Sequence, residues 1–409
     1  AAFIFVPFFW KAKVFTVPEY LGRRFNETIR TTMALIWGLF MCAMLGTFLY
    51  AAAIAMENLM GLPPWLSVII TAIVVGLYTF SGGLRAVVIT DAVQFVILFL
   101  GSALILVFGF NKIGGIEGLM NAVDTTAPGK EHYFHLILKG DTPHPFSWSA
   151  VLFGLAFVLS PAYWIGNQAI VQRNLGTKSQ RDAKKSVLFG AFLKLFIPAI
   201  IVIPGMIGFG LYPHLEDGQE VFPHMLKVLL PPGVKGIVFA GFLAALMSSV
   251  DSYLNSASTL WTMDIYKRHI KKDATSTELF KVGKILTASF IIMAIPLAYI
   301  AAKFGNIFSY MQTLLSLFQG PTLAILVLGM LYKRTNSKGA MTGLFGGLAV
   351  SSFLFYFKDL LFIATDPFLY IAWWSFVASL ILTYGVSMLT LKPSVKNTEG
   401  LCYTTLKDG

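Results

Sequence analysis

The stretch IVFAGFLAALMSSVDSYLNSAS, from Ile237 to Ser258, begins apolar enough to lie in lipid and ends with several serines, an aspartate and an asparagine. An ionisable residue at the centre of a bilayer costs a few kcal/mol and usually faces a cavity or a partner. The rest of the sequence therefore has to explain why a carboxylate, Asp251, stands in such a segment.

The composition identifies the surroundings of this stretch as a membrane. The chain has 409 residues, of which 56% are hydrophobic, 14% aromatic and only 12% charged, and its mean hydropathy is +0.72. These values are not those of a soluble core. They predict an all-α polytopic protein that crosses the membrane of the cell, plasma or inner, many times.

About ten segments are long enough to cross a hydrocarbon layer of roughly 30 Å. They are Thr31 to Leu59, Pro63 to Phe80, Val87 to Phe110, Trp148 to Val171, Ser186 to Leu211, Gly236 to Met263, Ile285 to Ala301, Ile307 to Tyr332, Gly339 to Phe357 and Pro367 to Leu391.

The net charge of +11 would suggest a nucleic-acid partner in a soluble chain, but the positive-inside rule explains it better here, because the basic residues fall in alternate loops. We expect no nucleic acid as a partner, and place these loops in the cytoplasm. Their basic residues are Lys11, Lys13, Arg23, Arg24 and Arg30, then Arg85, then Arg173, Lys178, Arg181, Lys184 and Lys185, then Lys267, Arg268, Lys271 and Lys272, and finally Lys333, Arg334 and Lys338. The opposite loops, including the long one from Asn111 to Ser147, are mixed in charge.

The first residues, AAFIFVPFF, resemble the end of a spanning helix, without a methionine, a basic leader or a cleavage site, so we expect the chain to be a fragment. Its two cysteines, Cys42 and Cys402, offer no disulfide framework. The pattern contains no metal-ligand spacing and no nucleophile constellation, so an enzyme is not expected.

Two predicted helices carry a helix-breaking pair near their centres, Ser160-Pro161 and Gly320-Pro321. Each pair weakens backbone hydrogen bonding where bulk water is absent. A packing kink is the plain explanation for either pair alone, whereas two central breaks together are typical of transporters.

Three charged residues inside the predicted helices are candidates for function. Lys194 stands about eight residues into its helix, roughly 12 Å from the cytoplasmic end, although its long side chain could still reach the interface. Asp91 lies about one turn into its helix, where an interfacial role is nearly as reasonable as a functional one. Asp251 belongs to the opening stretch.

Helical spacing in the opening stretch arranges its polar groups on two adjoining faces. One face carries Ala245, Ser249 and Ser252, and the other carries Ser248, Asp251 and Asn255. Oxygen groups of this kind suit a small hard cation or a proton. Serines alone more often bond back to their own helix or pack against a neighbour, so it is the buried carboxylate that favours cation or proton handling.

Three motifs carry a family resemblance: TVPEYLGRRFN at Thr16 to Asn26, YTFSGGLRAVVITDAVQ at Tyr78 to Gln94, and LMSSVDSYLNSASTLWTMDIYKR at Leu246 to Arg268. Together, and in this order, they resemble the sodium:solute symporter family, nearest to its sodium/glucose and bacterial sodium/galactose branches. The resemblance extends with varying strength from the first loop to the last helices.

This resemblance implies a single transmembrane transporter domain over residues 1–409. It implies the inverted five-plus-five helical repeat of leucine-type transporters, with discontinuous helices at the two proline pairs beside the substrate cavity. It also implies sodium-driven alternating access, and that the first broken helix of repeat one precedes Ala1, so that the chain is truncated at its N-terminus and would not transport alone.

Carried over residue by residue, the resemblance places the main sodium site at the carbonyl of Ala245 and the hydroxyls of Ser248 and Ser249. Asp91 matches an aspartate on the sodium exit route or at a second sodium site, to which Ser248 and Ser252 would contribute. Asp251 stands where sugar-transporting relatives have alanine or a hydroxyl residue. It could form a second cation or proton site, or anchor a neighbouring helix.

For the substrate, the resemblance matches Lys194 and Gln312 to residues that hydrogen-bond the sugar, and Tyr163 to the ring that closes the cavity from inside. A flat ring with a polar tip suits the apolar face of a sugar. Met44 and Ser160 replace asparagines of the galactose transporter, and such changes in hydrogen bonding shift substrate preference strongly. We therefore expect a sugar or another small polyhydroxylated or carboxylated solute.

Rival functions remain at this point. A proton-coupled carrier would use Asp91, Asp251 and Lys194 as relay groups, and a channel or solute sensor would bind without accumulating its ligand. The expected partners in all cases are a small solute and the lipid bilayer, with Na⁺ as the coupling ion in the favoured one.

Overall fold

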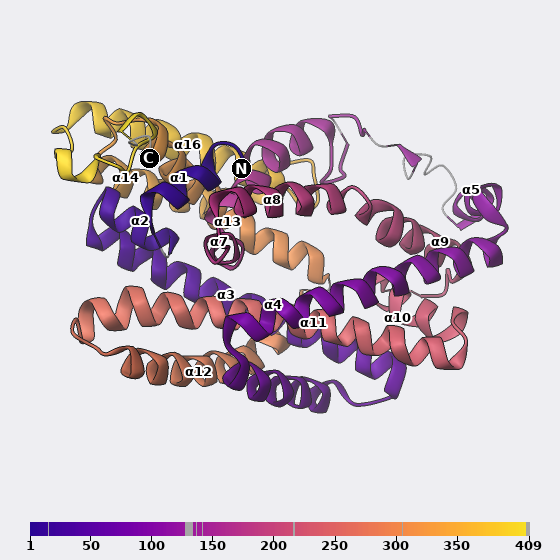
Figure 1. Cartoon of the computed structure of the whole chain (residues 1–409). Helices are drawn as coiled ribbons and strands as arrows, with labels where there is room; N and C mark the ends of the chain where they lie inside the picture. The colour runs from indigo at the N-terminus through magenta and orange to yellow at the C-terminus, as the bar shows by residue number, and fades with distance from the viewer. Residues whose placement is uncertain are drawn as a thin grey trace.

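The computed structural model describes residues 1–14, 16–126, 134–135, 137–140, 142–215, 217–304 and 306–405, without the side chains of residues 78 and 80–88. Within these ranges the chain is helical and contains no β-strand, and its long helices lie side by side (Figure 1). The side chain of Arg85 and parts of the predicted loop between Asn111 and Ser147 lie outside the described residues.

Each of the ten predicted segments corresponds to an apolar helix. Eight are long enough to span a bilayer: α3 (Glu27–Met60), the Ile89–Ile113 part of α4 (Pro64–Ile113), Gln180–Leu211, Pro232–Ile270, α12 (Ser276–Ala302), α13 (Ile307–Leu331), α14 (Ser337–Tyr356) and α16 (Phe368–Leu389). The span Gln180–Leu211 consists of α8 (Gln180–Lys194), η3 (Pro198–Val202) and α9 (Ile203–Leu211), and the span Pro232–Ile270 consists of α11 (Pro232–Leu260) and η4 (Trp261–Ile270). The ninth is a bent pair, Ala150–Gly166 with Gln168–Leu175, and the tenth is the shorter Pro64–Leu77 portion of α4. The prediction of a polytopic all-α protein is confirmed.

Shorter helices connect or flank these segments. They are α1 (Phe5–Ala12), α2 (Val17–Arg24), α5 (Gly115–Thr126), α10 (Gly218–Leu229), α15 (Lys358–Leu361), η5 (Val395–Asn397) and η6 (Tyr403–Thr405).

Helix α4 differs from the prediction of two helices joined by a loop. Its helical backbone is continuous over 50 residues. Straight, a helix of this length would extend about 75 Å at 1.5 Å per residue, more than twice the hydrocarbon layer. Figure 1 shows its two apolar portions, Pro64–Leu77 and Ile89–Ile113, running in opposite directions, so both predicted crossings are present although the connection is helical.

The break expected at Ser160-Pro161 lies instead at Asn167. A π-helix, η2 (Ala150–Leu159), passes directly into α6 (Ser160–Gly166), and Pro161 occupies the first turn of α6 without interrupting the helix. The chain then bends by 51° between Gly166 and Gln168. Asn167 is extended and its side chain accepts from the Ala169 amide at 3.0 Å, which starts α7 (Gln168–Leu175).

The break expected at Gly320-Pro321 is absent, because both residues lie inside the continuous helix α13. A Cβ at Gly320 would come within 2.6 Å of the Ala372 carbonyl oxygen of α16, and a Cβ at Gly347 of α14 would come within 2.8 Å of Pro321. The pair therefore serves close helix packing, which is the plain explanation for such residues in membranes.

This packing gives the first testable prediction. Gly320→Ala should lower the free energy of unfolding by about 1 to 3 kcal/mol, because the backbone of α16 must move away from the new methyl group. Gly385→Ala in α16 is the control, since a Cβ there meets nothing within 4 Å, and it should be neutral or slightly stabilising. Thermal denaturation in detergent measures both, and equal melting temperatures would contradict the packing argument.

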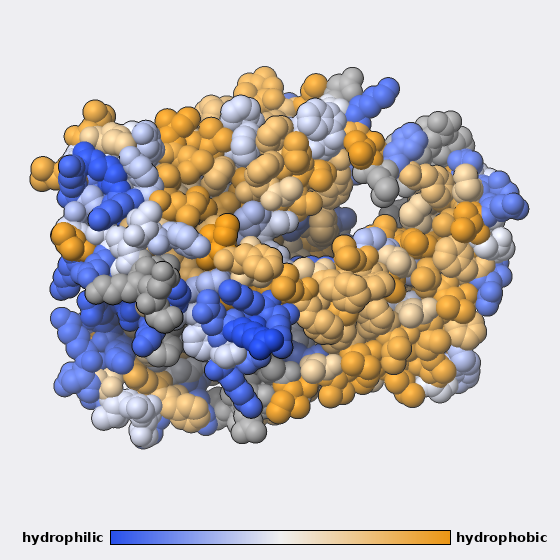
Figure 2. All heavy atoms as spheres, turned by 45° about the horizontal axis from the view of Figure 1, so that its top comes forward, coloured by the Kyte–Doolittle hydropathy of each residue, from blue (hydrophilic) through white to orange (hydrophobic). Residues whose placement is uncertain are grey.

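The molecular surface agrees with a membrane location. Figure 2 shows a broad apolar surface along the flank of the molecule, with hydrophilic residues gathered toward its left and right ends. Exposed apolar side chains such as Leu100, Phe189, Ile285 and Phe353 are therefore positioned to face lipid.

A buried ion pair joins α3 to η4 (Trp261–Ile270) at the end of the long helices that we expect to be cytoplasmic. The Arg30 Nε donates to Asp264 Oδ1 at 2.7 Å, and Thr16 donates its hydroxyl to the other carboxylate oxygen at 2.8 Å. Asp264 is completely buried. Beside it, Arg268 and Glu27 form an exposed pair at 2.7 Å.

Candidate functional site

The polar stretch of α11 meets two other helices through a compact cluster of Asp91, Ser248, Ser252 and Arg173. Ser248 donates to Asp91 Oδ1, and Arg173 pairs with Asp91 Oδ2 at 2.8 Å. The same Arg173 group also donates to the Ser252 hydroxyl. The carboxylate of Asp91 therefore lies against α11.

The serines of α11 also bond back to their own helix. Ser252 donates to the Ser248 carbonyl oxygen at 2.6 Å and Ser256 to that of Ser252 at 2.8 Å. Ser249 reaches the Ala245 carbonyl oxygen only at 3.4 Å, which is a weak contact. The Ser249 hydroxyl therefore makes the longest of these three hydrogen bonds, and it adjoins the Ala245 carbonyl oxygen.

Arg173 was missed as a site residue, because the sequence placed it among loop charges. It lies in α7, the short helix beyond the bend at Asn167, and also donates to the Ala169 carbonyl oxygen at 2.9 Å. The bend turns α7 toward α11, where Asn167 also contacts the Tyr253 hydroxyl at 3.4 Å. The contact of α7 with α11 depends on the position of this bend, which lies seven residues beyond Ser160, where the break was predicted.

Asp251 is completely buried, as predicted, and neither carboxylate oxygen has a hydrogen bond of good geometry within the described part of the chain. The Thr79 hydroxyl is a neighbouring polar group, also buried and without a hydrogen bond there. Buried polar groups normally have partners. A buried carboxylate with so few partners is stabilised by a bound proton or a nearby cation.

The predicted substrate residues Lys194 and Tyr163 lie together. The Lys194 ammonium is 4.3 Å from the centre of the Tyr163 ring and 5.0 Å from that of Trp164. Lys194 is the last residue of α8 and lies near the middle of the 32-residue Gln180–Leu211 span. Cation–π contacts of this kind hold an ammonium over an aromatic surface away from water.

The other substrate residues are less directly connected. Ser160 is exposed at the start of α6, and Gln312 is half-buried on α13, a helix that contacts α6. Among the described residues, no hydrogen bond joins Gln312 to Lys194 or Tyr163. Met44 is completely buried in the apolar core around α3.

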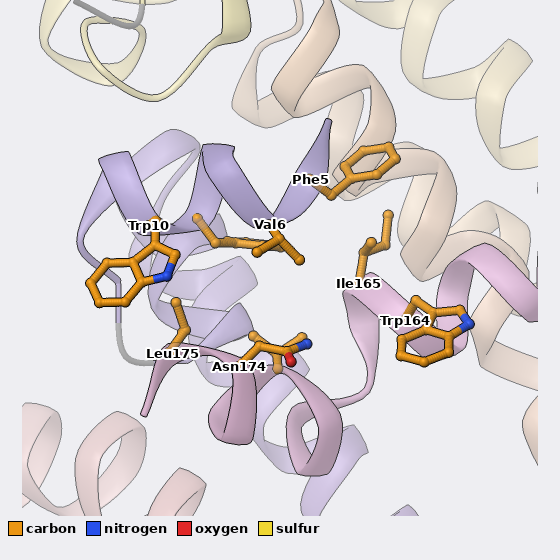
Figure 3. A pocket seen from close by; sticks show the side chains of 9 residues that line it. Phe5, Val6, Trp10, Trp164, Ile165, Asn174 and Leu175 are labelled. Carbon is orange, nitrogen blue, oxygen red and sulfur yellow. The ribbon is translucent and has the colours of Figure 1, made fainter. Parts of the chain in front are cut away.

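A small pocket beside Trp164 is a packing defect and not a substrate cavity. Phe5, Val6 and Trp10 of α1 face Ile165, Asn174 and Leu175 of α6 and α7 across it, with Trp164 at one end (Figure 3). Its free volume of about 10 Å³ holds at most one water molecule.

Comparison with known proteins identifies the family of this chain. The sequence profile of the sodium:solute symporter family matches residues 1–347. The chain is 33% identical over 370 residues to a sodium/glucose cotransporter of Vibrio parahaemolyticus, covering 86% of this chain and 68% of that protein. It is 34% identical over 383 residues to sodium/myo-inositol cotransporter 2 of Mus musculus, covering 85% of this chain but 56% of that protein. The chain thus spans between about half and two thirds of the length of these relatives.

The fold is shared with a solved transporter. A substrate-bound outward-open state of a Na⁺-coupled sialic acid symporter superposes with a TM-score of 0.81, covering 96% of this chain and 81% of that one, at 22% sequence identity. This confirms the leucine-transporter type of fold. By its sequence profile and its relatives, the chain belongs to the sodium:solute symporter family, whose members are membrane transporters and not enzymes.

Proposed function

We propose that this chain forms the transport body of a sodium-coupled secondary active symporter that imports a small polar solute, most directly a sugar or sugar-like compound, by alternating access. The observation that carries the proposal is the cluster in which Asp91 of α4 meets Ser248 of α11 inside a membrane protein. Oxygen ligands from two helices suit Na⁺, and both helices can then be held together or released as the ion binds or leaves.

In this proposal the main sodium ligands are the Ala245 carbonyl oxygen and the Ser248 and Ser249 hydroxyls. Asp91 and Ser252 serve the exit route or a second sodium site. One charge moving through 100 mV of membrane potential supplies about 2.3 kcal/mol, which corresponds to nearly fifty-fold accumulation of the solute.

The substrate site consists of Lys194, Tyr163, Gln312, Ser160 and Met44. The Lys194 ammonium over the Tyr163 ring supports a cargo with oxygen acceptors, because an ammonium donates three hydrogen bonds. A carboxylated cargo would be held by the same group. Gln312, Ser160 and Met44 rest on the family resemblance.

Asp251 favours one second candidate function, a proton-coupled carrier. Its buried carboxylate, which has no hydrogen bond of good geometry among the described residues, would be stable when protonated. Uptake that follows a pH gradient in the absence of sodium would reveal this function.

The decisive experiment measures uptake of radiolabelled sugars, inositols, sialic acid and monocarboxylates by the full-length protein in sealed liposomes, with and without an inward sodium gradient. Sodium-dependent accumulation of one solute supports the proposal and names the cargo. Binding without uphill uptake would indicate a sensor or channel instead.

Ser249→Ala should raise the sodium concentration needed for half-maximal uptake by about tenfold, since it removes one of the few oxygens available to the ion. Ser258→Ala is the matched control on α11, because the Ser258 hydroxyl bonds only to the Asn255 carbonyl oxygen at 3.0 Å among the described contacts. Undiminished sodium dependence in Ser249→Ala would remove Ser249 from the site.

Lys194→Ala should weaken the apparent substrate affinity by roughly ten- to a hundredfold, as expected for loss of a charge-assisted hydrogen bond. Lys185→Ala removes an exposed charge from the same helix and should leave the affinity unchanged. Concentration dependence of initial uptake rates measures both variants. An unchanged affinity in Lys194→Ala would move the substrate site elsewhere.

A further inference from the structure

A polar pocket of about 250 Å³ lies away from the transport site, between α2, the beginning of α14 and the segment that follows α16. Its lining includes Arg24, Ser337, Lys338, Lys392, Ser394 and Asn397. Three of its lining residues are cations and none is a carboxylate. The pocket is therefore suited by charge to an anion.

Arg24 is the most informative residue of this lining. It is completely buried. Its Nε donates to the Gly329 carbonyl oxygen at 2.8 Å and its Nη2 to that of Tyr332 at 3.1 Å. Its Nη1 has no hydrogen bond of good geometry among the described residues. The Cys402 thiol lies beside the guanidinium, and no carboxylate pairs with it there.

The carbonyls at the end of α13 offset only part of this buried charge. A buried cation is normally paired with an anion. Arg24 lines the pocket and has no such partner among the described residues, so its charge favours an anion there.

The first turn of α14 supplies further donors to the same pocket. The Asn336 side chain caps the helix by accepting from the Gly339 amide at 2.9 Å. The amides of Ser337 and Lys338 precede the first intrahelical hydrogen bonds and have no acceptor in the described ranges. The start of a helix favours phosphate and similar anions through such amides and through the helix dipole.

The walls of the pocket are held by side-chain hydrogen bonds. Asn336 Nδ2 donates to the Leu391 carbonyl oxygen at 2.8 Å and to the Thr390 hydroxyl at 2.6 Å. Asn397 Nδ2 donates to the Phe25 carbonyl oxygen at 3.2 Å. These bonds tie the segment after α16 to α2 and α14, so the donors around the pocket are fixed before an anion arrives.

The pocket opens on the face where the sequence places the cytoplasmic loops, beside the basic run Lys333, Arg334 and Lys338. This face of a membrane carries anionic lipid headgroups that attract basic segments. We propose that the pocket bounded by Arg24, Lys338 and Lys392 binds a phosphate group, carried either by an anionic phospholipid or by free inorganic phosphate. This inference is independent of the cargo and of the coupling ion.

The test uses the full-length purified protein in neutral detergent with two separate probes, inorganic phosphate and short-chain phosphatidic acid, each titrated calorimetrically. Lys338→Gln/Lys392→Gln should weaken binding of the preferred probe by at least about tenfold, because two charge-assisted contacts are lost. Lys184→Gln/Lys185→Gln, which removes the same charge from α8, should bind as the wild type does.

A second variant separates the helix start from general charge. Ser337→Pro removes one amide donor at a position where proline fits a helix, and it should weaken binding severalfold without a change of net charge. Binding of phosphate alone identifies free phosphate as the ligand, and binding of the lipid alone identifies a headgroup. The proposal is overturned if neither probe binds, or if the α8 control loses as much affinity as the pocket variant.

Discussion

Replacing Asp264 by alanine is expected to lower the free energy of unfolding by about 3 to 5 kcal/mol, the largest effect that the structure predicts for a single side chain. The carboxylate is completely buried and receives the Arg30 Nη2 at 2.6 Å and the Thr16 hydroxyl at 2.8 Å. Its removal leaves the charge of Arg30, whose side chain is only 13% exposed, without its carboxylate partner. Thermal denaturation in detergent should show a sharply lower midpoint.

The neighbouring pair Arg268 and Glu27 provides a matched control, because it joins the same two elements but is exposed. Glu27→Gln should cost less than about 1 kcal/mol, as is usual for surface ion pairs. The double variant Arg30→Met/Asp264→Leu should recover much of the loss, since replacing both charges with apolar groups leaves none unpaired. If the two single variants melted alike, the buried pair would not be holding α3 against η4.

Replacing Asp91 by alanine is expected to reduce sodium-driven uptake by up to about a hundredfold, the upper part of the range for coupling between two sites. Asp91 is the carboxylate that accepts from Ser248 and pairs with Arg173 at 2.8 Å. Its loss removes the charged oxygen group nearest to the proposed ions. Initial uptake rates in liposomes, normalised to the amount of protein inserted, measure the effect.

Asp91 could instead act only by neutralising Arg173, and the double variant Asp91→Ala/Arg173→Gln distinguishes the two roles. If the aspartate supplies oxygen to sodium, the double variant stays inactive. If it serves only as the partner of Arg173, removing the unpaired cation restores uptake. Restoration would contradict the sodium role while leaving the sodium-coupled function itself intact.

Much of the fold could be predicted from the sequence, because lipid demands long apolar helices whose backbone groups are satisfied within each segment. All ten predicted segments are helical, from Glu27–Met60 to Phe368–Leu389. The break predicted at Ser160-Pro161 lies at Asn167, and the break predicted at Gly320-Pro321 is absent. Proline shows where an amide is missing, but neighbouring packing decides whether the helix is interrupted, as the continuous course of α13 through Pro321 shows.

The sequence indicated some of the contacts that the structure shows around the candidate site. The matches to Lys194 and Tyr163 identified two groups that lie against each other, and the burial of Asp251 followed from its apolar surroundings. Arg173 was missed, since a basic residue near the end of a predicted helix looks like any loop charge. Its role depends on the 51° bend that turns α7 toward α11.

The sequence by itself determined the class of protein, the number of apolar segments, the family motifs and the set of polar side chains in the membrane. These are properties of composition and of local periodicity, and each can be read without knowing the neighbours of a residue. Tertiary structure alone decided which polar groups meet: Asp91 with Arg173, Asp264 with Arg30, and Arg24 with the end of α13. A charge in a membrane helix is tolerated when it finds a partner, and the partner belongs to another helix far away in the chain.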